Sequence, residues 1–454
     1  MTTPFPGLPG LPGLNEMLNL NPLVQTLQRQ RRLPRPLPLH LLQALMYARP
    51  WFELNPMPAM QPPAQLPAPT STAPLLPNWS AAWTGFPPAS SASKPNSSAS
   101  ANNSINPSNN HPDFDPAAFL SASLKLAGAE LALWCRGVEL YASALRPALP
   151  KPMPVVWQDG TTKLRDYGGP VTGGCGTIIV VPSLVNRAGI LDLLPGQSLL
   201  RHLSHHGRVL LVDWDAPGDI EKHFTLDDYI ARLLTVVTRA QAEGGRVHLM
   251  GYCMGGLLAL AAAQLAEQPV DRLALLATPW DFSAYAPSSR LGVAQWQLAL
   301  TPWLSAGQPV PVDILQTLFA LLQPMAAYEK FKKAGKNGID DLFVTVEDWL
   351  NDGVELPARV AQLCFGDWFG LNNTASRQWR VRGTVIEPAQ VTTPSLVIAP
   401  LHDQLVPHAV AAPLAKQLGQ AQLLSPPLGH IGMIVGRQAR PLVWDKLADF
   451  FRAV

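Results

Sequence analysis

The pattern of hydrophobic and polar residues changes near residue 155. Beyond it, short apolar runs alternate with amphipathic ones, which is typical of a mostly parallel sheet with helices on its faces. We predict strands near 177–181, 208–212, 246–250, 272–277, 395–399 and 421–424. A helix between the second and third strands has a capping box at Thr225 and Asp228 and ends at Gly244-Gly245. Residues 155–454 therefore form an α/β domain.

Residues 282–385 interrupt this alternation. The segment reads as helical and lies between two predicted core strands, where a lid over an active site is commonly inserted. It is rich in tryptophan, with Trp296, Trp303, Trp349, Trp368 and Trp379. These side chains either exclude water from a pocket or simply pack the helices of the segment together.

The N-terminal third divides into three parts. Residues 1–53 are rich in Leu and Pro with a cluster of arginines, and 54–113 form a Pro/Ser/Asn-rich stretch with too little apolar area to offset the entropy of ordering. We expect the second part to be a disordered linker. Residues 114–154 begin with a helical pattern that prolines end after about residue 146. Its expected apolar face comprises Phe119, Leu120, Leu124, Leu131, Trp134, Leu140 and Leu145.

The amino-acid composition limits the classes of partner and site that the chain can have. The chain is 47% hydrophobic and only 15% charged, which suggests an apolar partner. Its net charge of +2 gives no long-range electrostatic attraction for a nucleic acid. Four scattered cysteines give neither a metal site nor a disulfide framework and fit a reducing cytoplasm. No signal peptide or transmembrane segment is recognisable.

Residues 246–256 carry the strongest chemical signal. They read Arg-Val-His-Leu-Met-Gly-Tyr-Cys-Met-Gly-Gly, an apolar strand that enters a Gly-x-Cys-x-Gly turn before an apolar helix. This is a nucleophile elbow in which Cys253 replaces the usual serine. Gly251 and Gly255 leave room for a sharp turn, and the dipole of the following helix favours a negatively charged sulfur. We therefore expect an α/β-hydrolase fold with Cys253 as nucleophile.

A cysteine nucleophile needs a base, and the base needs an orienting acid. In this fold both follow the nucleophile, acid first. Asp403 lies in the loop after strand 395–399, and His430, bracketed by glycines, follows strand 421–424. We take them as acid and base. Asp281, shortly after strand 272–277, is a rival acid, and His402 is expected to be solvated.

An oxyanion hole requires two backbone N–H donors. One is expected from Met254, the residue after the nucleophile. The loop after strand 177–181 supplies the other, from either Ser183 or Leu184.

Five motifs together resemble the polyhydroxyalkanoate synthases: Gly-Tyr-Cys-Met-Gly-Gly, the stretch 181–193, Phe-Thr-Leu-Asp-Asp-Tyr-Ile from 224, Asp-Gln-Leu-Val-Pro from 403 and Gly-His-Ile-Gly from 429. The resemblance covers residues 155–454. It implies that Cys253, Asp403 and His430 are the catalytic residues. It further implies polymerisation of (R)-3-hydroxyacyl-CoA with release of CoA, at the surface of polyester granules and as a homodimer. Separately, we expect neither a cofactor nor a metal.

The chemistry of cysteine agrees with this reaction, because a thioester on Cys253 keeps the acyl group transferable. The same residues would also serve a cysteine hydrolase: a thioesterase, a dienelactone-hydrolase-like enzyme or an intracellular polyester depolymerase. A third hypothesis is a granule-surface scaffold protein that docks through its Leu/Pro-rich N-terminus.

Overall fold

The computed structural model describes residues 115–170, 173–322 and 325–453. The described residues belong to two compact units of the chain, residues 115–127 to one and residues from 128 onward to the other. Helix α5 (Pro116–Ser143) has residues in both. The expected N-terminal segment 1–53 and linker 54–113 lie outside the described residues.

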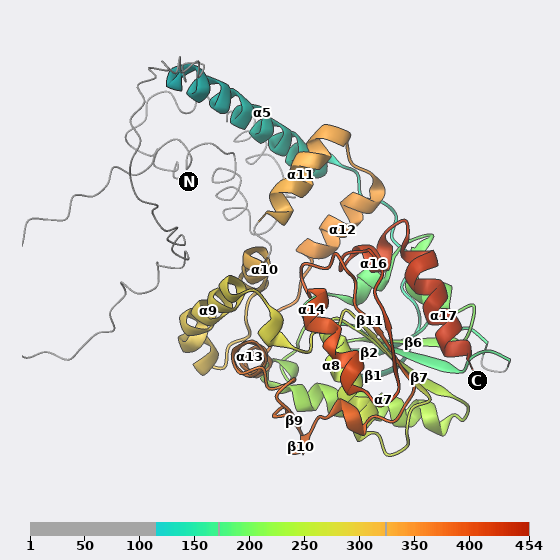
Figure 1. The fold of residues 1–454 in the computed structure, drawn as a ribbon. Helices are drawn as coiled ribbons and strands as arrows, with labels where there is room; N and C mark the ends of the chain where they lie inside the picture. Colours follow the sequence, from blue (N-terminus) through green and yellow to red (C-terminus); the bar gives the residue numbers. More distant parts are fainter. Residues whose placement is uncertain (1–114, 171–172, 323–324, 454) are drawn as a thin grey trace, which may run out of the picture. The chain divides into compact units, whose positions relative to one another are not determined.

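An eight-stranded sheet forms the centre of this unit (Figure 1), in the order β1-β2-β6-β3-β7-β8-β11-β12. The strands are β1 (Val155–Asp159), β2 (Thr162–Asp166), β3 (Thr177–Val181), β6 (Arg208–Asp213), β7 (Val247–Tyr252), β8 (Arg272–Leu276), β11 (Ser395–Ile398) and β12 (Ala421–Leu424). The six strands from β6 to β12 in this order are parallel and lie close to the predicted bounds. The prediction of a mostly parallel α/β sheet is confirmed.

Alternate residues of the strands enter two separate cores. Ile179 and Val181 of β3 pack in the core formed with α7 (Leu226–Ala242) and α8 (Met254–Leu265). Ile178 and Val180 pack in the other core. That second core includes α6 (Leu199–Leu203), α16 (Gly432–Val435) and α17 (Asp445–Arg452). Figure 1 labels α16 and α17 on this face of the sheet. Burial on both faces explains why the central strands β3, β8 and β11 are largely continuous apolar runs instead of alternating patterns.

The capping box of α7 is present. The backbone N–H and the hydroxyl of Thr225 both donate to the Asp228 carboxylate, each at 2.7 Å. Beyond the helix, Gly244 and Gly245 have φ of +81° and +87°, which glycine adopts without strain. The predicted start and stop of this helix are confirmed.

The first two strands were not predicted from the sequence. β1 and β2 form an antiparallel hairpin in which Asp159 pairs with Thr162, so Gly160 and Thr161 make a two-residue turn. Gly160 has φ +57°, as such turns require. Glycine at the first position of this turn was therefore the available signal.

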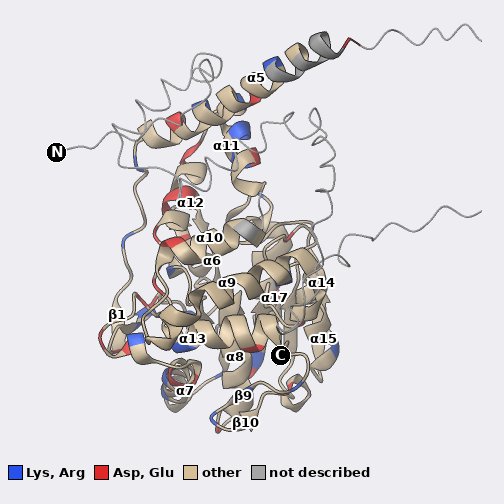
Figure 2. Cartoon of the chain, turned by 90° about the vertical axis from the view of Figure 1, so that its left-hand side faces the viewer, with Lys and Arg blue, Asp and Glu red and all other residues tan. Residues whose placement is uncertain are grey.

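A helical insertion separates β8 from β11 and is drawn yellow to orange in Figure 1. Its elements are α9 (Pro287–Ser305), α10 (Val312–Leu322), α11 (Ala326–Asn337), α12 (Asp341–Asn351), α13 (Ala358–Gln362), the π-helix η5 (Leu363–Gly370), and the short strands β9 (Arg380–Val381) and β10 (Thr384–Val385). Figure 2 shows that α9 and α10 carry few charged residues. We keep the name helical insertion for residues 282–385.

Shorter elements complete this part of the chain. They are the 3₁₀ helices η2 (Ala188–Leu191), η3 (Glu221–His223), η4 (Phe282–Ala284) and η6 (Pro388–Gln390), the strands β4 (Asp192–Leu194) and β5 (Gln197–Ser198), the helices α14 (His408–Ala411) and α15 (Pro413–Gln417), and the π-helix η7 (Arg440–Trp444).

Within residues 128–143, α5 buries an apolar face against the insertion. Leu131 and Trp134 are buried as expected. A Cβ on Gly137 would lie 1.9 Å from the Phe331 carbonyl oxygen, so the backbones of α5 and α11 are in contact there. Leu145 was wrongly assigned to this face. It is 90% exposed because α5 ends at Ser143.

Candidate active site

Cys253 lies in the sharp turn between β7 and α8. Its φ is +56°, a strained conformation for a residue with a side chain, and its N–H donates to the Leu276 carbonyl oxygen at 2.8 Å. A Cβ on Gly251 would lie 2.4 Å from Gly256 Cα, and one on Gly255 would lie 2.2 Å from the Val181 carbonyl oxygen. Both glycines are therefore sterically required, as the elbow motif predicts.

The structure brings Asp403 and His430 together from the loops after β11 and β12. His430 Nδ1 is 2.7 Å from Asp403 Oδ2. The other carboxylate oxygen of Asp403, Oδ1, accepts the backbone N–H groups of Leu405 at 2.9 Å and Val406 at 2.8 Å. The Asp403 side chain is fully buried, and these contacts fix its orientation toward the imidazole.

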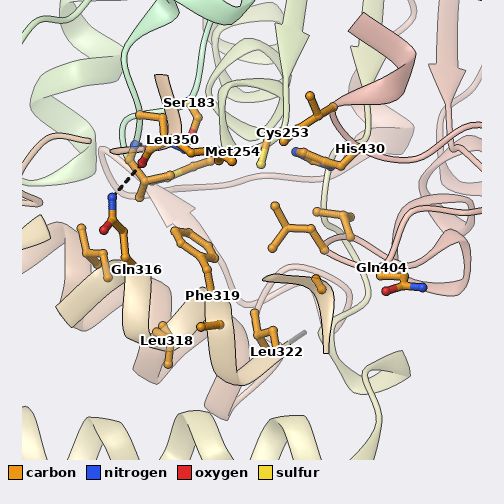
Figure 3. Close-up of a pocket in the computed structure, with 18 of the residues that line it drawn as sticks. Ser183, Cys253, Met254, Gln316, Leu318, Phe319, Leu322, Leu350, Gln404 and His430 are labelled. Carbon is orange, nitrogen blue, oxygen red and sulfur yellow. Dashed lines mark hydrogen bonds between the residues drawn. The ribbon is translucent and has the colours of Figure 1, made fainter. Parts of the chain in front are cut away.

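The imidazole of His430 faces the sulfur of Cys253 (Figure 3). Burial alone would lower the pKa of His430, but the charges of Asp403 and Cys253 and hydrogen bonds to both side chains outweigh it and raise the pKa to about 10. The site therefore favours a protonated imidazole beside the sulfur, with the buried Asp403 carboxylate behind it.

The rival acid Asp281 is not at this site. It caps η4, where its carboxylate accepts from the N–H and the hydroxyl of Ser283 and from the amide of Asn372. His402 is exposed, although it lies at the edge of the same cavity. Of the two carboxylates considered, only Asp403 contacts the imidazole of His430.

The expected oxyanion donors lie on two adjacent segments. Met254 is the first residue of α8, and the first N–H groups of a helix have no acceptor within it. The loop after β3 lies against this turn, because a Cβ on Gly255 would be 2.5 Å from the Pro182 carbonyl oxygen. Ser183 lines the cavity, whereas the Leu184 side chain is buried in the core. An oxyanion hole made by Met254 with Ser183 or Leu184 stays a prediction.

A cavity of about 620 Å³ opens beside Cys253 (Figure 3). Its walls are mostly apolar and come largely from the helical insertion, including Phe282, Leu318, Phe319, Phe365, Trp368 and Phe369. Trp349 also lines it, while Trp379 is buried behind Trp368 with ring centroids 5.6 Å apart. Trp349 and Trp368 thus form part of the cavity wall and Trp379 packs behind it, whereas Trp303 is 44% exposed.

Sequence reasoning missed two tyrosines at this site. Tyr252 and Tyr285 both line the cavity, and their hydroxyls donate to backbone carbonyls of the loops that carry His430 and Asp403. Tyr252 could have been suspected from its place next to Cys253. Tyr285 had no sequence signal, because its partner is 120 residues away.

Within the described ranges, no helix is both long enough and apolar enough to cross a lipid bilayer. The same residues contain no group of three or more His, Cys, Asp or Glu side chains arranged to hold a metal ion.

Comparison with known proteins agrees with the fold. The sequence model of the alpha/beta hydrolase fold family matches residues 176–437, and the chain belongs to this family. Within it, the chain is similar to curated proteins named poly(3-hydroxyalkanoate) polymerase subunit PhaC. Identity is 27% over 313 residues with the Haloferax mediterranei protein, covering 66% of this chain and 63% of that protein. The resemblance drawn from the motifs is confirmed.

Two further relatives carry the same name. The Haloarcula marismortui protein is 26% identical over 60% of this chain and 60% of its own length. The Synechocystis sp. protein is 27% identical over 58% of this chain and 75% of its own length. The chain thus spans less than two thirds of the first two relatives.

Proposed function

We propose that the chain is an acyltransferase that polymerises (R)-3-hydroxyacyl-CoA into polyhydroxyalkanoate and releases CoA. The observation that carries this proposal is the array of Cys253, His430 and Asp403 at the wall of an apolar cavity. Similarity to proteins named poly(3-hydroxyalkanoate) polymerase supports the choice of substrate.

In the first half-reaction, Sγ of Cys253 attacks the carbonyl carbon of the acyl-CoA thioester. The negative charge that develops on the carbonyl oxygen is held by the N–H of Met254 and by an N–H of the loop after β3. The C–S bond to CoA then breaks, and the leaving sulfur takes the proton carried by His430. The products are free CoA, a neutral imidazole and an acyl group on Cys253.

In the second half-reaction, a 3-hydroxyl group attacks the acyl-Cys253 thioester. His430 accepts the hydroxyl proton, the new C–O ester bond forms, and the bond to Sγ breaks. The free sulfur of Cys253 and the proton on His430 that the first half-reaction used are thereby restored. Formation of an oxoester from a thioester drives elongation forward.

Water must be kept from the acyl-enzyme, since its attack would give a free hydroxy acid. The apolar residues that the helical insertion contributes to the cavity favour exclusion of water, and we propose that this insertion acts as a lid. We further propose that the protein works in the cytoplasm at the surface of polyester granules and as a homodimer. The low fraction of charged residues supports an apolar partner of this kind.

The test is product analysis with purified protein and 3-hydroxybutyryl-CoA. Polymer should accumulate in proportion to the CoA released, and Cys253→Ala should abolish both. Free 3-hydroxybutyrate as the sole product would refute polymerisation and identify a cysteine hydrolase. Absence of CoA release would refute the acyl transfer itself.

A further inference from the structure

Tyr252 contacts His430 in two ways. It is the last residue of β7 and directly precedes Cys253. Its hydroxyl donates to the His430 carbonyl oxygen at 3.1 Å, and its ring lies 5.0 Å from the imidazole with 32° between the planes. The side chain therefore holds both the backbone and the ring of His430.

Tyr285 contacts the other loop. It follows η4 at the start of the helical insertion, and its hydroxyl donates to the Leu405 carbonyl oxygen at 3.0 Å. The N–H of Leu405 donates to Asp403 Oδ1 at 2.9 Å. The ring of Tyr285 also lies 5.0 Å from the ring of Phe369, which lines the cavity. One side chain thus joins the insertion to the loop that orients the imidazole.

We propose that Tyr252 and Tyr285 are positioning residues that hold the loops of His430 and Asp403, and thereby keep the imidazole in line with Cys253. The inference rests on the roles of these three residues in the proposed function. Tyr252 acts on the base directly, and Tyr285 acts through the backbone of Leu405.

Three properties support this role. Glycines flank the His430 loop at Gly429 and Gly432, so the backbone there has little intrinsic restraint and gains from an external contact. Both tyrosines are buried, so rotation of their rings away from the loops would require repacking of the surrounding residues. Burial raises the pKa of each hydroxyl well above its usual value, so both remain donors throughout the working pH range.

The experiment compares Tyr252→Phe, Tyr285→Phe and the double variant with wild type. Each change removes one hydroxyl and keeps the ring. Tyr328→Phe is the matched control, because Tyr328 is also buried and its hydroxyl donates to Glu130, a residue that does not line the cavity. Two readouts are used: single-turnover CoA release from 3-hydroxybutyryl-CoA, and the pH dependence of Cys253 alkylation by iodoacetamide without substrate.

We expect each site variant to release CoA about tenfold more slowly with little change in KM, because small displacements of catalytic groups cost up to about a hundredfold. Alkylation of Cys253 at pH 7 should slow severalfold, and its pH profile should move to higher pH. The double variant should lose less than the product of the single losses, since both hydroxyls act on one imidazole. Tyr328→Phe should match wild type in both readouts.

Wild-type rates and pH profiles in both tyrosine variants would overturn the inference, as would an equal loss in Tyr328→Phe. A fall in thermal stability with an unchanged alkylation profile would show a purely structural role and would also overturn it. Failure of the proposed function is seen separately, because wild type itself would then release no CoA.

Discussion

Replacement of Asp403 by asparagine tests the orientation of the base most sharply. Asparagine keeps an oxygen for the N–H groups of Leu405 and Val406, so the loop should persist. Its amide NH₂ would face His430 Nδ1 in place of a carboxylate oxygen at 2.7 Å. The imidazole would then carry its proton on Nε2, toward Cys253, and would lose its counter-charge.

The magnitude follows from the lost charge. Two unit charges about 4 Å apart in an environment of effective dielectric constant about 20 attract by about 4 kcal/mol. At about 1.4 kcal/mol per factor of ten, this corresponds to about a thousandfold in rate. The dipole of the asparagine side chain compensates for part of the lost electrostatic attraction. We therefore expect acylation to slow by between about a hundredfold and a thousandfold.

The assay is the burst of CoA release on rapid mixing with 3-hydroxybutyryl-CoA, with thermal unfolding as a check on folding. Asp281→Asn is the matched control, because Asp281 is the other carboxylate considered but contacts Ser283 and Asn372. It should retain the wild-type rate within about threefold, the scale of a modest local change of less than 1 kcal/mol. A loss of less than tenfold in Asp403→Asn, or equal losses in the two variants, would refute the reasoning.

Three further predictions concern folding. Gly255→Ala should prevent folding or sharply reduce soluble expression and the unfolding temperature. The reason is that the added Cβ would lie 2.2 Å from the Val181 carbonyl oxygen. An unfolding temperature equal to that of wild type would contradict this. Asp228→Ala should lower the free energy of unfolding in urea by about 1 kcal/mol, because the carboxylate no longer accepts the hydrogen bonds of Thr225. An unchanged urea concentration at the unfolding midpoint would count against the capping box. Because the pKa of His430 is raised to about 10, its protonation stabilises the fold fully below about pH 6.5. That contribution should be lost as pH rises through 10, so the difference in unfolding free energy between wild type and His430→Gln should shrink over this range; a constant difference would oppose it.

Much of the fold could be predicted because strands buried on both faces are short continuous apolar runs. The elbow at Cys253 was recognisable because its turn leaves no room for a side chain at Gly251 or Gly255. The β1–β2 hairpin was missed, although Gly160-Thr161 is a turn signal, because its two strands contain polar residues and lack the continuous apolar runs of the parallel strands. Leu145 was misplaced because periodicity does not show where a helix ends before a proline.

The site was less fully predictable for a physical reason. The contact of Asp403 with His430 follows from the order of loops in this fold, but the hydroxyl contacts of Tyr252 and Tyr285 join residues 178 and 120 positions apart. Nothing local in the sequence marks such pairs. The walls of the cavity likewise depend on how the helices of the insertion pack, which the tryptophan content alone does not determine.

The central claim is that the sulfur of Cys253 carries the acyl group during the reaction. The most direct test is to quench the protein with acid shortly after mixing with 3-hydroxybutyryl-CoA and to locate the added mass by peptide mass spectrometry. The account predicts a 3-hydroxybutyryl group on the peptide that contains Cys253, removable by hydroxylamine and absent in Cys253→Ala. Release of CoA with no acyl group on that peptide, or continued turnover by Cys253→Ala, would contradict it.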